Sequence, residues 1–237
     1  MNIKYYTGTL VFSRQYAHRV NHWRKRQWCI SQVTSEYLMR MEDVLDVYDL
    51  PYDPRHPVIC LDERPCQLLG DTVIPLPMTP GQPTKEEYQY ERHGVCRLFV
   101  AVEPLAGRRV AQVRPRRTKE DYAAFMQALA AQYPQTERLR VVQDNVNPHT
   151  AGSFSQAFDP ATAWALKQRF ECHATPPHAS WLNMAEIELS AIARQCLNRR
   201  IASLDELERE VLACVKERNE QQRRITWRFT TPDARVK

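Results

Sequence analysis

"RLFVAVEPLAGRRVAQVRP", residues 97–115, is the stretch of this chain that decides its fold. Two runs rich in apolar and β-branched residues, 97–104 and 108–115, flank the short connection "LAG". Such runs predict strands, and a glycine in a short connection between two strands favours a β-hairpin. The sheet of this protein is therefore expected to contain an antiparallel pair.

Helices and further strands are expected on both sides of this hairpin. Short apolar runs predict strands at residues 58–63, 138–145 and 170–174. Amphipathic spacing predicts helices at residues 35–48, 118–133, 160–169, 181–200 and 204–219, with Thr118 as the cap of the second. The proline-rich residues 71–95 are expected to form a long loop. This order predicts an α/β fold with a mixed sheet and helices on both of its faces.

The composition is that of a globular protein. Of the 237 residues, 43% are hydrophobic and 26% are charged. There is no long apolar run and no signal-peptide pattern, which predicts a cytoplasmic protein with no membrane partner. The seven cysteines form no C-x-x-C pair, so reduced thiols are expected in place of a zinc site.

Basic residues are unevenly distributed along the chain. The formal net charge is +5, and residues 1–35 hold no acid at all. Two further basic clusters cover residues 108–119 and 218–237. Separate basic patches with nearby tryptophans suit a polyanion such as nucleic acid, and solvated surface faces are an equally open interpretation.

Two aspartates follow apolar runs that predict strands. Asp62 ends "VICLD" and Asp144 ends "RVVQD". Ligands gather at strand ends in open α/β sheets, and two carboxylates that meet there repel each other unless a cation lies between them. The alternative is that each aspartate shapes a turn after its strand.

The helix expected from residue 181 carries two acids near its start. Asn183 and Glu186 fit a variant capping box, which would explain Glu186 by local hydrogen bonding. On a helical wheel Glu186 lies roughly 60° from the centre of the apolar stripe, and Glu188 lies roughly 100° away on the other flank. We therefore expect Glu186 to face the sheet and Glu188 to face water. Three converging carboxylates suit two-metal phosphodiester cleavage.

Five stretches resemble one family, the DDE transposases of bacterial insertion sequences in the mariner superfamily branch. They are "CLDERPCQLLG" (60–70), "RTKEDYAAFM" (117–126), "VVQDNVNPHT" (141–150), "TPPHASWLNMAEIELSAIARQCLNRRI" (175–201) and "ITWRFTTPDARVK" (225–237). The resemblance runs from about Trp28 to the C-terminus, and its 175–201 stretch is the most specific. It implies a ribonuclease-H-like catalytic core.

The resemblance also implies the site. Its three catalytic, metal-binding carboxylates fall on Asp62, Asp144 and Glu186, which would hold two Mg²⁺ or Mn²⁺ ions. Five further residues, expected either to support the metal ligands or to contact DNA, are Asn145, His149, His178, Trp181 and Asn183. For Asn145 and His149 the alternative is that they shape the turn after the strand, and for Trp181 it is core packing at the helix start.

The family resemblance implies cleavage at element ends and strand transfer into target DNA by a homodimer. We expect residues 55–237 to form the catalytic domain and residues 1–54 to be a basic segment and helix. About fifty residues before "VICLDE" are too few for the two helix-turn-helix modules usual in the family. The chain is thus either a truncated copy or the downstream product of a frame-split gene. A non-catalytic DNA-binding or dimerising remnant and a structure-selective nuclease are the alternative functions.

Overall fold

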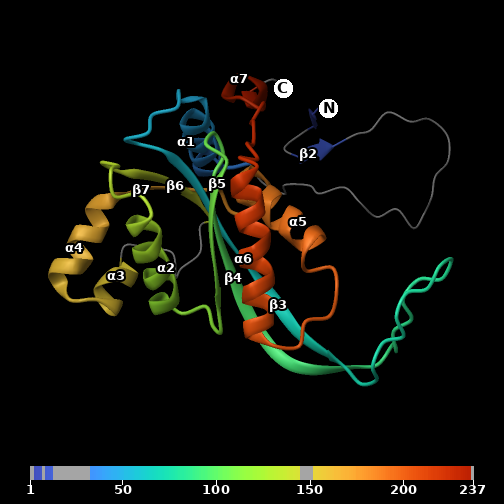
Figure 1. The fold of residues 1–237 in the computed structure, drawn as a ribbon. Helices are drawn as coiled ribbons and strands as arrows, with labels where there is room; N and C mark the ends of the chain where they lie inside the picture. Colours follow the sequence, from blue (N-terminus) through green and yellow to red (C-terminus); the bar gives the residue numbers. More distant parts are fainter. Residues whose placement is uncertain (1–2, 7–8, 13–32, 145–151, 236–237) are drawn as a thin grey trace.

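A mixed five-stranded sheet forms the centre of the molecule (Figure 1). The computed structural model describes the chain except for residues 1–2, 7–8, 13–32, 145–151 and 236–237. The sheet order is β5-β4-β3-β6-β7. The strands are β3 (Val58–Asp71), β4 (Tyr90–Glu103), β5 (Arg108–Arg114), β6 (Leu139–Gln143) and β7 (Phe170–Ala174). A separate antiparallel pair joins β1 (Ile3–Tyr6) and β2 (Thr9–Phe12).

The strand directions confirm the predicted fold class. β3, β4 and β5 form an antiparallel meander, and β6 and β7 run parallel to β3 on its other side. The hairpin between β4 and β5 is confirmed, and Gly107 turns it with a φ of 69°. A side chain at Gly107 would also meet the backbone of Gln222 at 2.6 Å. β3, the first strand of this sheet along the chain, lies in the middle of the order β5-β4-β3-β6-β7, which is the ribonuclease-H-like arrangement.

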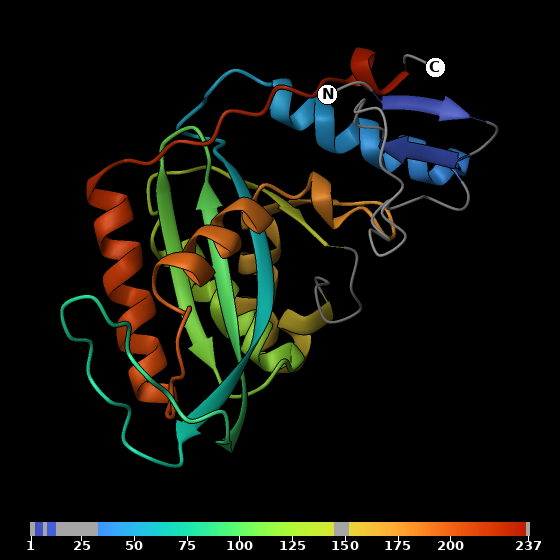
Figure 2. The same cartoon turned by 90° about the vertical axis from the view of Figure 1, so that its right-hand side faces the viewer.

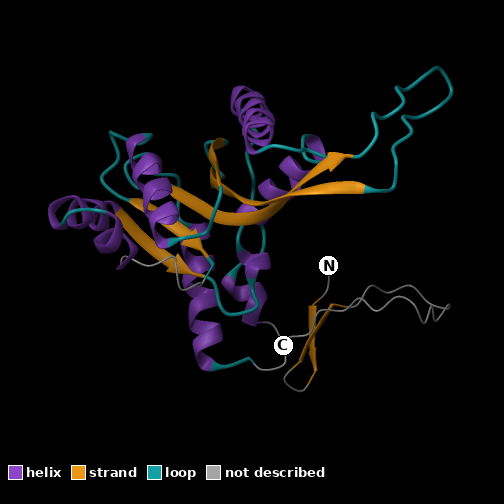
Figure 3. Cartoon of the chain, turned by 90° about the horizontal axis from the view of Figure 1, so that it is seen from below, coloured by secondary structure: helices purple, strands orange, loops and turns teal. Residues whose placement is uncertain are grey.

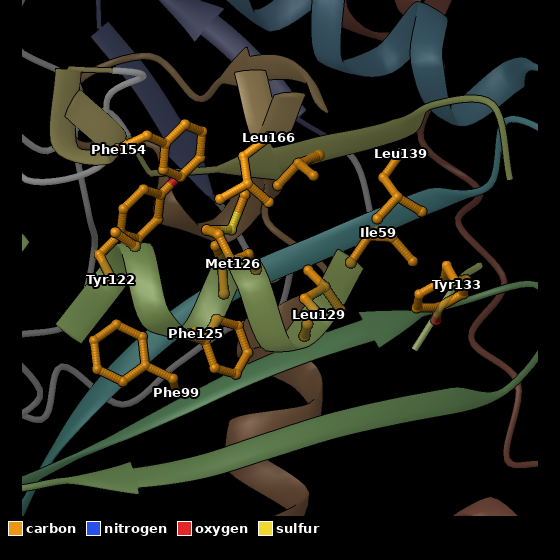
Figure 4. Packing of buried hydrophobic residues seen from close by; sticks show 14 of the residues in the cluster. Ile59, Phe99, Tyr122, Phe125, Met126, Leu129, Tyr133, Leu139, Phe154 and Leu166 are labelled. Carbon is orange, nitrogen blue, oxygen red and sulfur yellow. The ribbon is translucent and has the colours of Figure 1, made fainter. Parts of the chain in front are cut away.

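Helices cover both faces of the sheet (Figures 1 and 2). One face packs against α2 (Lys119–Ala131), α3 (Gly152–Ala157) and α4 (Pro160–Arg169), and the other packs against α5 (Ala185–Gln195) and α6 (Leu204–Glu220). Figure 4 shows the first core, where Phe99 and Phe125 stack with ring centroids 5.4 Å apart. Successive side chains of β3 point to opposite faces of the sheet, so Ile59 and Leu61 enter this core while Cys60 lies on the other face.

A third core cluster closes the end of the sheet nearest α1 (Ser35–Asp49). Buried residues of α1 pack there against Cys60 of β3, Val142 of β6 and the start of α5. The chain end, which includes α7 (Thr231–Arg235), adds Ala234 to the same cluster. The division into residues 1–54 and 55–237 stays a prediction, and α1 shares its buried surface with the sheet.

The expected short strand at 58–63 and long loop at 71–95 are corrected by the structure. β3 continues to Asp71 and pairs with β4 from Tyr90 onward, so the loop covers only residues 72–89. Residues 90–95 of β4 are exposed, and in β3 the exposed Arg64 and Pro65 interrupt the apolar run before buried positions resume at Cys66, so the sequence lacks the continuous apolar pattern that predicts a strand. The paired strands and their loop project from the body as an arm (Figure 3).

The helix starts follow from local capping. Thr118 and Asp121 form a reciprocal capping box at α2, in which the Thr118 hydroxyl accepts from the Asp121 N–H at 3.1 Å. Asp159 caps α4 through the N–H groups of Ala161 and Thr162, each at 3.1 Å. Across the part of the chain that the structure describes, no helix is both long and apolar enough to cross a bilayer.

Candidate active site

Asp62 and Asp144 become neighbours through the parallel pairing of β3 and β6. Cys60 pairs with Val142 and Leu61 pairs with Gln143, so the next residue on each strand is an aspartate. Cys60 and Val142 belong to the same core cluster, and residues two positions apart share a face of a strand. The Asp62 and Asp144 side chains therefore lie on the same face of the sheet as Cys60 and Val142. Asp62 lies inside β3, so the prediction that it ends a strand is wrong, whereas Asp144 directly follows β6.

The Asp62 carboxyl occupies a buried, negatively charged environment. Its residue is 6% exposed, and the Glu63 N–H donates to its Oδ1 at 2.7 Å. Burial raises the pKa of Asp62 to about 8, and the charges of Asp144, Glu186 and Glu63 contribute to the rise. A divalent cation would favour the ionised carboxylate at this position.

Glu186 enters the same environment from the first turn of α5. The residue is exposed at the edge of the site. Desolvation and then the Asp144 carboxylate raise the pKa of Glu186, and the nearby Arg64 guanidinium opposes the rise. The sequence prediction did not include Arg64, which lies two residues after Asp62 on the same face of β3.

Thr175 is a second residue that the sequence prediction missed. It follows β7, is 1% exposed, and its hydroxyl donates to Oδ1 of Asp144 at 3.1 Å. Its backbone N–H donates to the carbonyl oxygen of Gln143 at 2.9 Å, which continues the β6–β7 ladder by one residue. The sequence offered one signal for Thr175: it directly follows the strand predicted at residues 170–174. Thr175 thus orients the carboxylate of Asp144.

Asn183 connects α5 to β3 and forms no capping box with Glu186. Its side-chain Nδ2 donates to the Leu61 carbonyl oxygen at 2.8 Å, and its Oδ1 accepts from the Ala185 N–H at 3.1 Å. The helix begins at Ala185, later than residue 181, after a 3₁₀ turn at Ser180–Leu182 (η1). Glu186 is therefore left outside the local capping interaction that the sequence allowed.

Glu188 is buried, contrary to the prediction that it faces water. Its side chain is fully buried and pairs with Arg109 of β5 at 2.9 Å and with Arg218 of α6 at 2.5 Å. A helical wheel measures only the angle from the apolar stripe and says nothing about the charges on neighbouring elements. Two arginines on separate elements make this buried carboxylate acceptable.

The carboxylates fit hard divalent cations by their donor chemistry. Mg²⁺ and Mn²⁺ prefer carboxylate oxygen, and the mutual charge effects among Asp62, Asp144 and Glu186 indicate a repulsion that a cation would relieve. Within the described ranges, no three His, Cys, Asp or Glu side chains are already grouped closely enough to hold a metal ion.

A comparison with protein families identifies the family of the chain. Residues 57–208 match the family described as DDE superfamily endonuclease, and this range contains Asp62, Asp144 and Glu186. The chain belongs to this family. No curated protein sequence matches the chain.

Solved structures also resemble this chain at low identity. One is described as the Mos1 mariner paired end complex with Mn, with 16% identity and a TM-score of 0.49 over 88% of this chain and 65% of that chain. A pre-cleavage Mos1 transpososome has 17% identity and a TM-score of 0.46 over 89% and 66%. A simian T-cell lymphotropic virus intasome in complex with PP2A regulatory subunit B56 gamma has 14% identity and a TM-score of 0.41 over 70% and 50%. The chain spans less than two thirds of the length of each of these chains.

Two of the remaining predicted site residues, His178 and Trp181, lie around the start of α5. His178 is exposed and has a φ of 63°, which is a left-handed conformation that non-glycine residues adopt infrequently. Trp181 is 36% exposed and meets Phe229 edge-on at 5.8 Å between ring centroids. Asn145 and His149 lie outside the described residues. The roles of all four stay predictions.

Several arginines of the basic clusters have structural partners. Arg109 and Arg218 bind Glu188, Arg117 pairs with Glu63, and Arg235 pairs with Glu42 at 2.6 Å. These arginines pair with acids of the fold, so fewer basic side chains are available to a polyanion than the sequence clusters indicate. Exposed arginines remain in both clusters, among them Arg116, Arg224 and Arg228.

Proposed function

We propose that this chain is a transposase catalytic domain that cleaves DNA at element ends and joins the freed 3′-hydroxyl to target DNA. The observation that carries the proposal is the β3–β6 register, which brings Asp62 and Asp144 together on the face where α5 begins, within a member of the DDE endonuclease family. Asp62, Asp144 and Glu186 are the proposed catalytic metal ligands.

The proposed chemistry is an in-line displacement at a phosphodiester. Bound Mg²⁺ or Mn²⁺ supplies activation of the attacking oxygen and stabilisation of the leaving oxygen. The chain contributes the carboxylates and keeps them oriented: the Glu63 N–H holds Asp62, and the Thr175 hydroxyl holds Asp144. Preorganised ligands reduce the reorganisation needed when the substrate phosphate arrives.

DNA is the proposed partner, both as element ends and as target, in a bacterial insertion-sequence context within the cytoplasm. The exposed arginines noted above suit the phosphate backbone. The proposed active form is a homodimer. The projecting arm supports this proposal, because Ile74, Met78 and Tyr88 on it are 88%, 72% and 80% exposed.

Removal of divalent metal is expected to abolish cleavage. The substrate is duplex DNA that carries the inverted repeats flanking the coding sequence, and nicked, double-strand-cut and strand-transfer products are separated on a gel. Cleavage should appear with Mg²⁺ or Mn²⁺, disappear with EDTA, and return when excess Mn²⁺ is added, because the carboxylates alone cannot activate the attacking oxygen.

The same assay separates the alternative functions. Binding of element ends in a gel shift with no cleavage at any metal concentration would favour the non-catalytic remnant. Equal cutting of branched or RNA–DNA substrates, with no preference for inverted repeats and no strand transfer, would favour the structure-selective nuclease.

Polar substitution on the arm is expected to weaken dimerisation. The Ile74→Ser/Met78→Ser double variant should raise the dimer dissociation constant about tenfold or more, equal to roughly 1.4 kcal/mol, because apolar anchors dominate interface energies. Sedimentation velocity over a concentration series measures the change. Leu212→Ser on α6, at a residue that is 45% exposed, is the matched control and should leave the constant unchanged. Unchanged dimerisation of the arm variant would contradict the arm's role.

A further inference from the structure

We propose that Asn183 is a positioning residue whose carboxamide sets the separation between Asp62 and Glu186. This inference rests on the proposed function, because it assigns to Asn183 the task of aligning two of the three proposed metal ligands. Sequence alone left open whether Asn183 supports the ligands or contacts DNA.

The two ends of the Asn183 carboxamide contact the residues that directly precede the two acids. Nδ2 donates to the carbonyl oxygen of Leu61 at 2.8 Å, and Leu61 precedes Asp62. Oδ1 accepts from the N–H of Ala185 at 3.1 Å, and Ala185 precedes Glu186. One planar group thus joins the main chain of β3 to the main chain of α5 immediately before each carboxylate.

The backbone of Asn183 adds to this connection. Its carbonyl oxygen accepts from the N–H of Glu186 at 3.1 Å, and its own N–H donates to the Ser180 carbonyl oxygen at 2.8 Å. The residue is 1% exposed, so water has little access to the carboxamide and DNA cannot reach it without movement of the chain. Burial therefore favours the supporting role over DNA contact.

The contacts require an amide. A side chain at this position must donate to a carbonyl oxygen and accept from an N–H at the same time, and asparagine does both with one group. Aspartate has the same shape, but its ionised form has no donor and would face the Leu61 carbonyl oxygen. Asn183→Asp is therefore the substitution that disturbs the connection with the least change in volume.

A second group, the partly buried Tyr48 hydroxyl, holds the same turn and lies 3.4 Å from the Cys60 thiol of β3, but it does not contact the residue directly before either acid. The Tyr48 hydroxyl of α1 donates to the Leu182 carbonyl oxygen at 2.9 Å and accepts from the Met184 N–H at 3.4 Å. This contact is expected to keep the turn in place when Asn183 is replaced. Tyr48→Phe removes the hydroxyl contact and serves as the matched control for a general loosening of the turn.

The test compares Asn183→Asp, Asn183→Ala and Tyr48→Phe with the wild-type chain. Mn²⁺ binding is measured from the electron paramagnetic resonance signal of the free ion, and cleavage of element-end DNA is measured against Mn²⁺ concentration. Both Asn183 variants should bind Mn²⁺ about 10- to 100-fold more weakly, because groups that orient metal ligands contribute on this scale. High Mn²⁺ should restore part of their cleavage rate, while Tyr48→Phe should lower the melting temperature and leave the Mn²⁺ midpoint unchanged.

Two results would overturn the inference. Wild-type Mn²⁺ binding by Asn183→Ala, with only the melting temperature lowered, would reduce Asn183 to a structural residue. An equal loss of Mn²⁺ affinity in Tyr48→Phe would show that any loosening of the turn has the same effect. Failure of the proposed function looks different: the wild-type chain would bind Mn²⁺, Asn183→Ala would bind it more weakly, and neither would cleave DNA.

Discussion

Separate replacement of Asp62 by Asn, Asp144 by Asn and Glu186 by Gln is expected to lower metal-dependent DNA cleavage by about 10³-fold or more in each variant. This corresponds to roughly 4 kcal/mol of lost transition-state stabilisation. Each amide keeps the shape of the side chain and loses the negative charge that a divalent cation needs. Single-turnover cleavage of element-end DNA at saturating Mn²⁺ measures the effect.

Asp62→Asn should lower cleavage without lowering the stability of the metal-free chain at pH 8. Burial and neighbouring carboxylates raise its pKa to about 8, so the folded chain holds a proton on Asp62 that the unfolded chain releases above about pH 4. Stability from this group is therefore lost as the pH rises from about 4 to about 8. The carboxamide of the Asp62→Asn variant cannot ionise, so thermal unfolding of this variant without metal should show a melting temperature at pH 8 no lower than that of the wild-type chain.

An exposed acid provides the control for the cleavage assay. Glu220 is exposed at the end of α6, and Glu220→Gln removes the same charge as Glu186→Gln outside both the proposed metal site and the arm. The control should cleave at the wild-type rate. Retention of cleavage by any one of the three carboxylate variants would remove that residue from the proposed metal site.

The sequence predicted those features that depend on local patterns. The β4–β5 hairpin, the helix cap at Thr118, α4 and β7 follow from propensity, caps and apolar spacing, and the structure confirms them. The length of β3 was not predicted, because Arg64 and Pro65 interrupt its apolar run and its outer half, which is buried at Cys66, is stabilised by pairing with β4. Local pattern thus located the elements, and non-local pairing set their extent.

The candidate site shows the same division. The acids were recognisable in the sequence, where Asp62 and Asp144 were each expected to end a strand. In the structure the register of β3 and β6 instead sets Asp62 inside β3, beside the end of β6. Thr175, Arg64 and the carboxamide contacts of Asn183 become visible only when distant segments meet. Non-local contacts of this kind carry no periodic signal that a single sequence could reveal.

Glu188→Ala is expected to destabilise the fold by about 3–5 kcal/mol. The substitution leaves the fully buried Arg109 guanidinium without its carboxylate partner, and an uncompensated buried charge costs on this scale. Desolvation already lowers the pKa of Arg109, and Glu188 is the first group that opposes this shift. Chemical denaturation measures the loss in free energy of unfolding, and the melting temperature should fall by roughly 10 °C.

A double variant tests whether the charge, rather than the packing, is responsible. Glu188→Leu/Arg109→Met replaces the buried ion pair by apolar side chains and should recover much of the stability lost in Glu188→Ala, because apolar groups of similar volume commonly replace such pairs without loss. If Glu188→Ala were as stable as the wild-type chain, the pairing with Arg109 and Arg218 would not hold in solution.

The two glutamates of α5 should therefore fail in different ways, although they are two residues apart. Glu186→Gln should keep its melting temperature and lose cleavage, because Glu186 lies exposed at the edge of the carboxylate cluster. Glu188→Ala should lose stability, and at a temperature where it remains folded it should retain metal-dependent cleavage above that of Glu186→Gln. The reverse ranking would mean that the buried glutamate, and not the exposed one, is the third metal ligand.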